Sequence, residues 1–160
     1  MKKIFFIAIT AMISFSAISQ SKSSGGSSFS GGLEIGLPMG DFNVTQSLGY
    51  GASVHGLFGD KSGFTASIGY MSFSGKSFNG GTYAAFGLTP VKVGYRLASE
   101  GGFYTEPQVG ISFYTGGSGF TYAPVVGVMT GSLDLSVRYE SISSTGSTLS
   151  FLGFRLGYKF

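Results

Sequence analysis

The chain ends in a ten-residue stretch, FLGFRLGYKF at 151–160, in which every second residue is apolar and the residues between them include two cations. A β-strand turns successive side chains to opposite faces, so this stretch has one apolar face and one polar face if it is a strand. The same alternation recurs in seven earlier stretches, which are separated by residues that favour turns. These stretches cover residues 33–39, 50–58, 64–70, 83–97, 103–113, 120–128 and 133–139.

Charged residues in these stretches occur only at the positions that alternate with the apolar ones, and therefore on the opposite face of each strand. A soluble barrel has an apolar interior and a charged exterior, which is the reverse of this distribution. Charges in a dry interior are costly and a wholly apolar wall aggregates in water, so the pattern argues against a soluble barrel. A bilayer removes the conflict, because the apolar face meets lipid and the polar face lines the lumen. The predicted lumenal charge network consists of Glu34, Lys92, Arg96, Glu106, Asp134, Arg138, Glu140, Arg155 and Lys159.

We therefore predict an all-β fold, an eight-stranded antiparallel up-and-down transmembrane β-barrel over residues 33–160. With the N-terminus in the periplasm, the outward aromatic side chains fall into two girdles, one near each end of the strands. Residues 82–98 are interpreted as one long strand that contains Pro90. Proline donates no hydrogen bond to a ladder, so Pro90, Pro107 and Pro124 are expected at bulges or local breaks.

Residues 1–19 are predicted to be a signal peptide that is removed on export, because two lysines, a short apolar run and small residues follow one another in the expected order. Residues 20–32, QSKSSGGSSFSGG, are predicted to form a flexible N-terminal tail, since serine and glycine neither bury a core nor hold one conformation. Without Lys2 and Lys3, the ten basic residues fall to eight, against seven acidic ones. This balance predicts no nucleic-acid partner.

The predicted lumen is close to neutral, with five permanent cations and four acids. An eight-stranded barrel is only just wide enough for its side chains to fill, and large residues such as Tyr104, Phe73 and Phe151 share the inward parity. We therefore expect a side-chain-filled lumen with a network of ion pairs. The alternative is a narrow or gated pore for small solutes, which requires uncompensated lumenal charge or a continuous water path.

His55 is the single histidine of the chain. As the base of a lipid-modifying outer-membrane enzyme it would need a serine nucleophile and an orienting acid. Outer-membrane lipid deacylases carry that serine two residues beyond the histidine, where this chain has Leu57. We expect a hydrogen-bonded lumenal histidine and keep the enzyme as a second alternative. One histidine without cysteine does not make a zinc site, so no catalytic residue, metal or cofactor is predicted.

Several segments resemble the small outer-membrane β-barrel proteins of Gram-negative bacteria, the OmpX-like and OmpA-like size class. They are GLPMGDF at 36–42, YGASVHGLF at 50–58, VKVGYRL at 91–97 and the terminal Phe160, together with the signal peptide and the eight-strand pattern. The resemblance covers about residues 31–160 and implies a location in the outer membrane, in contact with its lipid. It also implies that the β-barrel assembly machinery reads the last strand during biogenesis. The positions that match this assembly signal are Phe154, Leu156, Tyr158 and Phe160.

These observations predict a small non-enzymatic outer-membrane barrel with a structural or surface-interaction role. The proposed outer loops are short for such a barrel, which limits the surface that they can build. The candidate partners for that surface are lipopolysaccharide, the envelope surface or another protein, and the sequence does not identify which of them binds.

Overall fold

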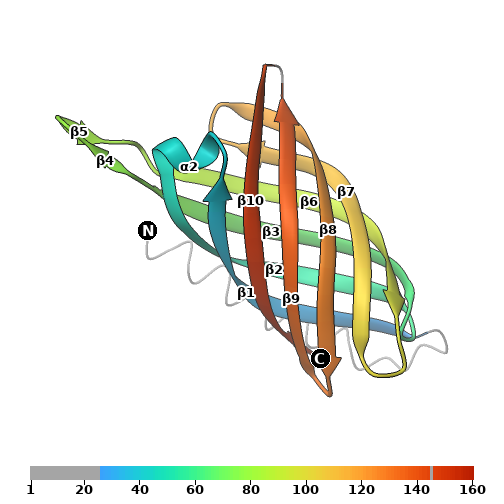
Figure 1. Cartoon of the computed structure of the whole chain (residues 1–160). Coiled ribbons are helices and arrows are strands. Elements are labelled where there is room, and N and C mark those ends of the chain that lie inside the picture. The colour runs from blue at the N-terminus through green and yellow to red at the C-terminus, as the bar shows by residue number, and fades with distance from the viewer. Residues whose placement is uncertain (1–25, 145) are drawn as a thin grey trace, which may run out of the picture.

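The stretches of alternating apolar and polar residues form the eight strands of one closed antiparallel barrel (Figure 1), which confirms the predicted fold class. The computed structural model describes residues 26–144 and 146–160, so the predicted signal peptide and residues 20–25 of the predicted tail lie outside the described residues. Each strand pairs with its neighbours along the chain, and the first pairs with the last. The barrel strands are β1 (Ser27–Met39), β2 (Gln46–Gly59), β3 (Gly63–Gly75), β6 (Phe86–Ala98), β7 (Phe103–Tyr114), β8 (Gly117–Thr130), β9 (Leu133–Ser144) and β10 (Ser147–Lys159).

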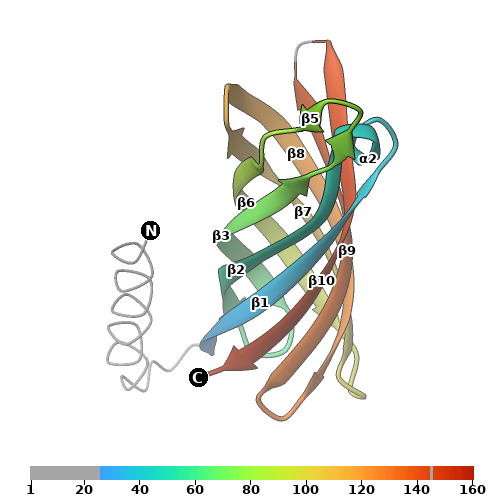
Figure 2. The same cartoon turned by 90° about the vertical axis from the view of Figure 1, so that its left-hand side faces the viewer.

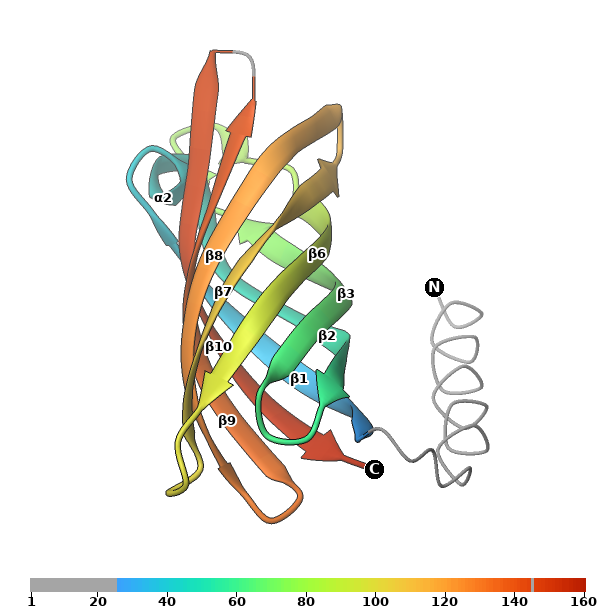
Figure 3. The same ribbon diagram turned by 90° about the vertical axis from the view of Figure 1, so that its right-hand side faces the viewer.

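The two ends of the barrel differ. At one end, here called the loop end, lie the one-turn helix α2 (Phe42–Thr45) and a small two-stranded ribbon formed by β4 (Ser77–Phe78) and β5 (Gly81–Thr82). At the other end, called the terminal end, β1 begins and β10 finishes, and the turns between strands are tight (Figures 2 and 3). None of the described residues belongs to a helix long and apolar enough to cross a membrane.

The barrel closes through β1, which begins six residues earlier than predicted. Residues 27–32 were assigned to the flexible tail, but they form strand and pair with both β2 and β10. The ring of Phe29 packs edge-on against Phe58 at 6.1 Å, and the backbone N–H of Phe160 donates to the carbonyl of Phe29 at 3.0 Å. The prediction of a tail up to residue 32 is wrong because serine and glycine become extended when strands on both sides satisfy their backbone groups.

The fourth barrel strand is shorter than predicted. Residues 82–98 were interpreted as one strand, whereas β6 begins at Phe86 and the segment before it turns back through the β4–β5 ribbon. Gly80 has a φ of 110° at the turn of this ribbon, a conformation that glycine adopts without steric cost. Tyr83, the first residue of the predicted strand stretch 83–97, lies instead at the base of the ribbon, between β5 and β6.

The three prolines of the central strands each lie at a gap in one hydrogen-bonded ladder. Pro90 lies at a gap in the β3–β6 ladder, Pro107 at a gap between β6 and β7, and Pro124 at a gap between β8 and β9. On the other side, Pro90 is opposite Ser112, and Pro107 and Pro124 are opposite each other. The strands continue past each gap in the same register, so the expected local breaks are confirmed and they do not interrupt the barrel.

The outer wall is apolar and the inner wall is charged, as predicted. Leu33 exposes 69% of its surface and Phe64 exposes 70%, whereas Glu106 exposes 1% and Glu140 is fully buried. This distribution is the inverse of a soluble protein and matches a transmembrane barrel. Outward aromatic side chains meet across strands near both ends: Phe64 with Tyr95 at the terminal end, and Tyr122 with Tyr139 towards the loop end.

The lumen at the loop end is filled by an apolar cluster, here called the aromatic plug. Phe42 enters it from α2, with its ring 4.9 Å from Phe73 and 5.2 Å from Phe86 in edge-on contacts. Phe73 in turn contacts Phe151 of β10 at 5.1 Å. The buried members are Phe42, Met71, Phe73, Leu88, Ile142 and Phe151, with Phe86, Tyr114 and Leu149 packed against them.

Glycines on the inner wall make the space that the plug occupies. A Cβ atom at Gly49 would lie 2.5 Å from two ring atoms of Phe73. We expect Gly49→Ala to lower the free energy of unfolding by about 1–3 kcal/mol through overpacking. Urea unfolding of the refolded barrel in lipid vesicles measures the change.

The contact between position 49 and the Phe73 ring also predicts how two substitutions combine in their effect on stability. Phe73→Leu removes the ring that collides with residue 49, so it should cost less stability in the Gly49→Ala background than in the wild type. Equal losses in the two backgrounds would show that the glycine is not there to accommodate the ring.

Candidate functional site

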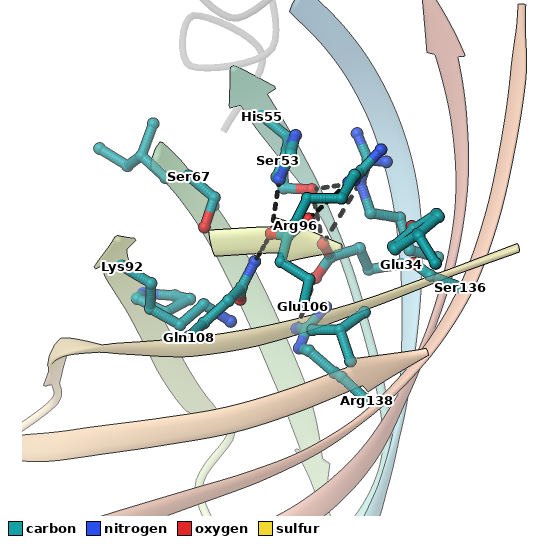
Figure 4. A pocket seen from close by; sticks show the side chains of 16 residues that line it. Glu34, Ser53, His55, Ser67, Lys92, Arg96, Glu106, Gln108, Ser136 and Arg138 are labelled. Carbon is teal, nitrogen blue, oxygen red and sulfur yellow. Dashed lines mark hydrogen bonds and ion pairs between the residues drawn. The ribbon is translucent and has the colours of Figure 1, made fainter. Parts of the chain in front are cut away.

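The lumen below the aromatic plug contains a network of buried charges drawn from five strands (Figure 4). Eight of the nine residues of the predicted network meet here, and none of the eight exposes more than 9% of its surface. They come from positions far apart in the chain that the closed barrel turns towards one axis. These eight are Glu34 of β1, Lys92 and Arg96 of β6, Glu106 of β7, Asp134, Arg138 and Glu140 of β9, and Arg155 of β10.

Arg138 organises the part of the network nearest the plug. Its Nη2 donates to Glu34 Oε2 at 2.7 Å, and its Nε donates to Glu140 Oε2 at 2.7 Å. Lys92 Nζ donates to the same oxygen of Glu140 at 2.8 Å. One guanidinium therefore ties β1 to β9, and the shared carboxylate ties β9 to β6. We call Glu34, Lys92, Arg138 and Glu140 the Arg138 cluster.

Glu106 organises a second group nearer the terminal end. Its Oε1 faces His55 Nε2 at 2.8 Å and also accepts hydrogen bonds from the side chains of Thr65 and Gln108. Its Oε2 accepts from Arg96 Nε at 2.7 Å. Four groups from four strands thus converge on one carboxylate, and few sites remain on it for water or a ligand.

Asp134 and Arg155 connect the two groups. Asp134 Oδ2 lies 3.2 Å from Arg155 Nη1 and 3.6 Å from Arg96 Nη2, and its Oδ1 accepts from the hydroxyl of Tyr104 at 2.6 Å. Arg155 Nε lies 3.9 Å from Glu34 Oε1, which links it to the Arg138 cluster. We call His55, Arg96, Glu106, Asp134 and Arg155, together with the hydrogen-bonding side chains around them, the Glu106 cluster.

The charges balance within each cluster as well as over the whole lumen. The Arg138 cluster contains two acids and two permanent cations, and so does the Glu106 cluster if His55 is neutral. A buried charge is strongly unfavourable unless an opposite charge and hydrogen bonds satisfy it. Pairing inside each cluster meets that condition, so no mobile counter-ion is required.

The structure departs from the prediction at Lys159. In the described part of the chain, no carboxylate lies within ion-pair distance of its ammonium group, and the side chain lines the opening of the lumen at the terminal end with Lys61 and Glu100. Parity placed Lys159 correctly on the inner wall. Parity cannot show that the position is at the mouth of the barrel, where water solvates a cation without a partner.

Several side chains bind the charged groups of the site although the sequence analysis did not predict these contacts. Tyr104 was expected only to fill space, yet it donates to Asp134 and its ring lies under the Arg96 guanidinium, 3.7 Å from the centroid. Ser53 donates to Glu34 and accepts from Arg155. Inward parity was the available signal for both residues. Phe42 gave no such signal, because it lies in a connection rather than in an alternating strand.

The space left inside the network is small. A cavity of about 30 Å³ lies between the two clusters, lined by Ser67, His55, Lys92 and Tyr104 among others, and it has room for about two water molecules. Ser67, which lines this cavity, has its Oγ buried without a protein partner, so it is the group that such water would satisfy.

The chemistry available in the lumen is limited. The Nε2 of His55 faces Glu106, and no hydrogen bond joins this histidine to a serine among the described residues. No group of three or more candidate metal ligands occurs in that part of the chain. The arrangement of these lumenal residues holds paired charges and leaves little room for water, but it does not assemble a nucleophile with a base.

Comparisons with known proteins agree with this geometry. No protein-family model and no curated protein sequence matches the chain. Among solved structures, Ail of Yersinia pestis in complex with the heparin analogue sucrose octasulfate has a TM-score of 0.61 at 14% identity, with 86% of this chain and 100% of that chain covered. The N-terminal β-barrel domain of Pseudomonas aeruginosa OprF has a TM-score of 0.60 at 12% identity, with 86% and 100% covered. Neisserial surface protein A has a TM-score of 0.56 at 10% identity, with 86% and 98% covered.

These identities are low, so the similarity is one of fold. The chain has the fold of the small eight-stranded outer-membrane β-barrels, which is the class that its sequence pattern resembled.

The contacts of Arg138 predict that its substitution destabilises the protein strongly. Arg138→Met leaves Glu34 and Glu140 buried with too few donors, so it should lower the free energy of unfolding by about 3–5 kcal/mol. Urea unfolding in lipid vesicles, followed by circular dichroism, measures this change.

Lys159→Met is the matched control, because it removes a cation of the same parity that has no ion pair among the described residues. It should change stability by no more than about 0.5 kcal/mol. Similar small losses for both variants would contradict a stabilising role for the Arg138 cluster.

Proposed function

We propose that this protein is a non-enzymatic outer-membrane barrel with a closed lumen, and that it acts through the surface at its loop end. The apolar wall meets outer-membrane lipid, the terminal end faces the periplasm, and the loop end faces outward. The strand that ends in Phe154, Leu156, Tyr158 and Phe160 serves as the signal for the β-barrel assembly machinery.

The observation that carries the proposal is the double closure of the lumen. The aromatic plug fills the loop end, and below it the two charge clusters leave a cavity of about 30 Å³. A passive pore needs a continuous water path and a field that attracts its solute. Here the lumenal charges are paired within each cluster, which favours a structural or surface role over transport.

The buried position of His55 supports the non-enzymatic part of the proposal. An enzyme that modifies membrane lipid needs its nucleophile and base where an acyl chain or a headgroup can reach them. His55 is 7% exposed, points into the lumen and is bound to a carboxylate that also accepts from Arg96. These contacts give the histidine a place in the structural network.

The loop end has few free cations with which to bind the anionic groups of a partner. Ail has been solved with a heparin analogue, and recognition of a sulfated sugar requires exposed cations. The connections at the loop end of this chain contain one acid, Asp41, and one base, Lys76. The Lys76 ammonium is already bound to the backbone and side-chain oxygens of Asn43. A partner that is recognised through its uncharged groups fits this surface better.

Conductance tests the closed lumen. The mature protein, refolded into a planar bilayer, should show no steady single-channel conductance, because two filled layers block the path. Heat-modifiable migration on a gel shows independently whether the barrel has folded.

A folded protein with steady conductance would overturn the proposal, most directly if neutralising Lys92, Arg96 or Arg138 changes that conductance. Such a result would make the chain a narrow pore.

A further inference from the structure

The β4–β5 ribbon extends the wall of the barrel beyond the rim of the loop end. It continues from β3 and returns into β6, and it leans away from the barrel, clear of the β9–β10 hairpin (Figures 1 and 2). Its base is fixed to the α2 connection. The backbone N–H of Lys76 donates to the carbonyl of Thr45 at 2.9 Å, and the Lys76 ammonium binds Asn43. The direction of the ribbon is therefore set by specific contacts.

One face of the ribbon presents two aromatic rings. Phe78 exposes 52% of its surface and Tyr83 exposes 41%, and their ring centroids are 4.8 Å apart. Ser77 and Thr82 meet on the opposite face, where their hydroxyl groups lie 3.4 Å apart. Alternate residues counted from the outward Tyr70 reach Phe78 through Ser72, Ser74 and Lys76, so the aromatic face lies on the same side as the outer wall, beyond a polar rim.

The surroundings of these rings are polar but uncharged. Ser74 and Asn79 are exposed residues near these rings in the chain, while the ammonium of Lys76 is held by Asn43. Phosphate recognition depends on free cations or clustered backbone N–H groups. A saccharide needs something different, which is an aromatic face for the apolar C–H side of the sugar ring and hydroxyl or amide groups for its hydroxyls.

From this geometry we propose that the aromatic face of the ribbon binds the saccharide headgroups of the surrounding outer-leaflet glycolipid. The face lies on the same side as the lipid-facing wall and beyond its polar rim, so glycolipids whose acyl chains touch the wall bring their sugars to the ribbon. Phe78 and Tyr83 form the stacking platform, and Asn79 and the nearby hydroxyl groups supply hydrogen bonds. The proposal names a partner for the loop end and therefore rests on the proposed function.

The absence of tryptophan from the sequence allows a direct test. Phe78→Trp places a single reporter on the platform, and the full mature protein is refolded into phosphatidylcholine vesicles with and without purified lipopolysaccharide. Quenching by acrylamide is measured, because this quencher is uncharged and the lipopolysaccharide phosphates do not repel it. We expect the quenching constant to fall by about half when lipopolysaccharide is present, since a stacked sugar shields the indole.

Two variants serve as controls. Thr148→Trp reports from the β9–β10 hairpin, which points away from the ribbon, and it should change little. Phe78→Trp combined with Tyr83→Ser removes half of the platform and should lose most of the protection. Heat-modifiable migration in each vesicle shows that the barrel is folded, which separates a failure of this site from a failure of the proposed barrel.

Three outcomes would overturn the inference. Equal protection in phosphatidylcholine alone would place the ribbon in the phospholipid headgroups. Equal protection of the indole in the Thr148→Trp variant would show general coverage by lipopolysaccharide, and no protection in either vesicle would leave the platform free for a soluble partner.

Discussion

The structure depends on one constraint, which is that no backbone N–H or C=O of a membrane-spanning strand can be left without a partner. Closure of β1 against β10 is the step that satisfies it, and the pairing runs from Ser30–Lys159 to Met39–Ser150. This explains why the segment 27–32 is a strand despite its composition. If it stayed a tail, the ends of β2 and β10 would each lose a neighbour at the terminal end.

Closure with eight strands then dictates the interior. The lumen is narrow enough for side chains to fill, so each inward charge must find its partner across the barrel rather than in water. Arg138 and Glu106 meet this requirement by binding residues from several strands at once. Inward glycines accommodate these large groups, as at Gly153, where a Cβ atom would lie 3.1 Å from the Arg138 side chain.

The sequence predicted the barrel, its outward face and eight lumenal charges, because alternation with period two reports directly which side of a strand a residue occupies. The sequence could not predict which of these charged residues form ion pairs with one another. Glu34 and Arg138 are 104 residues apart and meet only because the barrel closes in one register. The alternation of side chains also gives no guidance where the strands end. Lys159 lies at the terminal opening of the lumen, and Tyr83 lies at the base of the β4–β5 ribbon. Phe42 enters the aromatic plug from the one-turn helix α2. These positions depend on three-dimensional connections that alternation does not describe.

The distribution of roles along the molecule explains where an activity can lie. The outer wall is committed to lipid, and the lumenal side chains are committed to one another, so substitutions in either region act first on stability. The connections at the loop end are under neither requirement. Even there, α2 contributes Phe42 to the plug and Asn43 to the base of the ribbon, which couples lumen closure to the direction of the ribbon. Phe78 and Tyr83 are exposed aromatic side chains outside both the lipid-facing wall and the plug, and this is why they, rather than His55 or the charge clusters, are the residues whose chemistry is available to a partner.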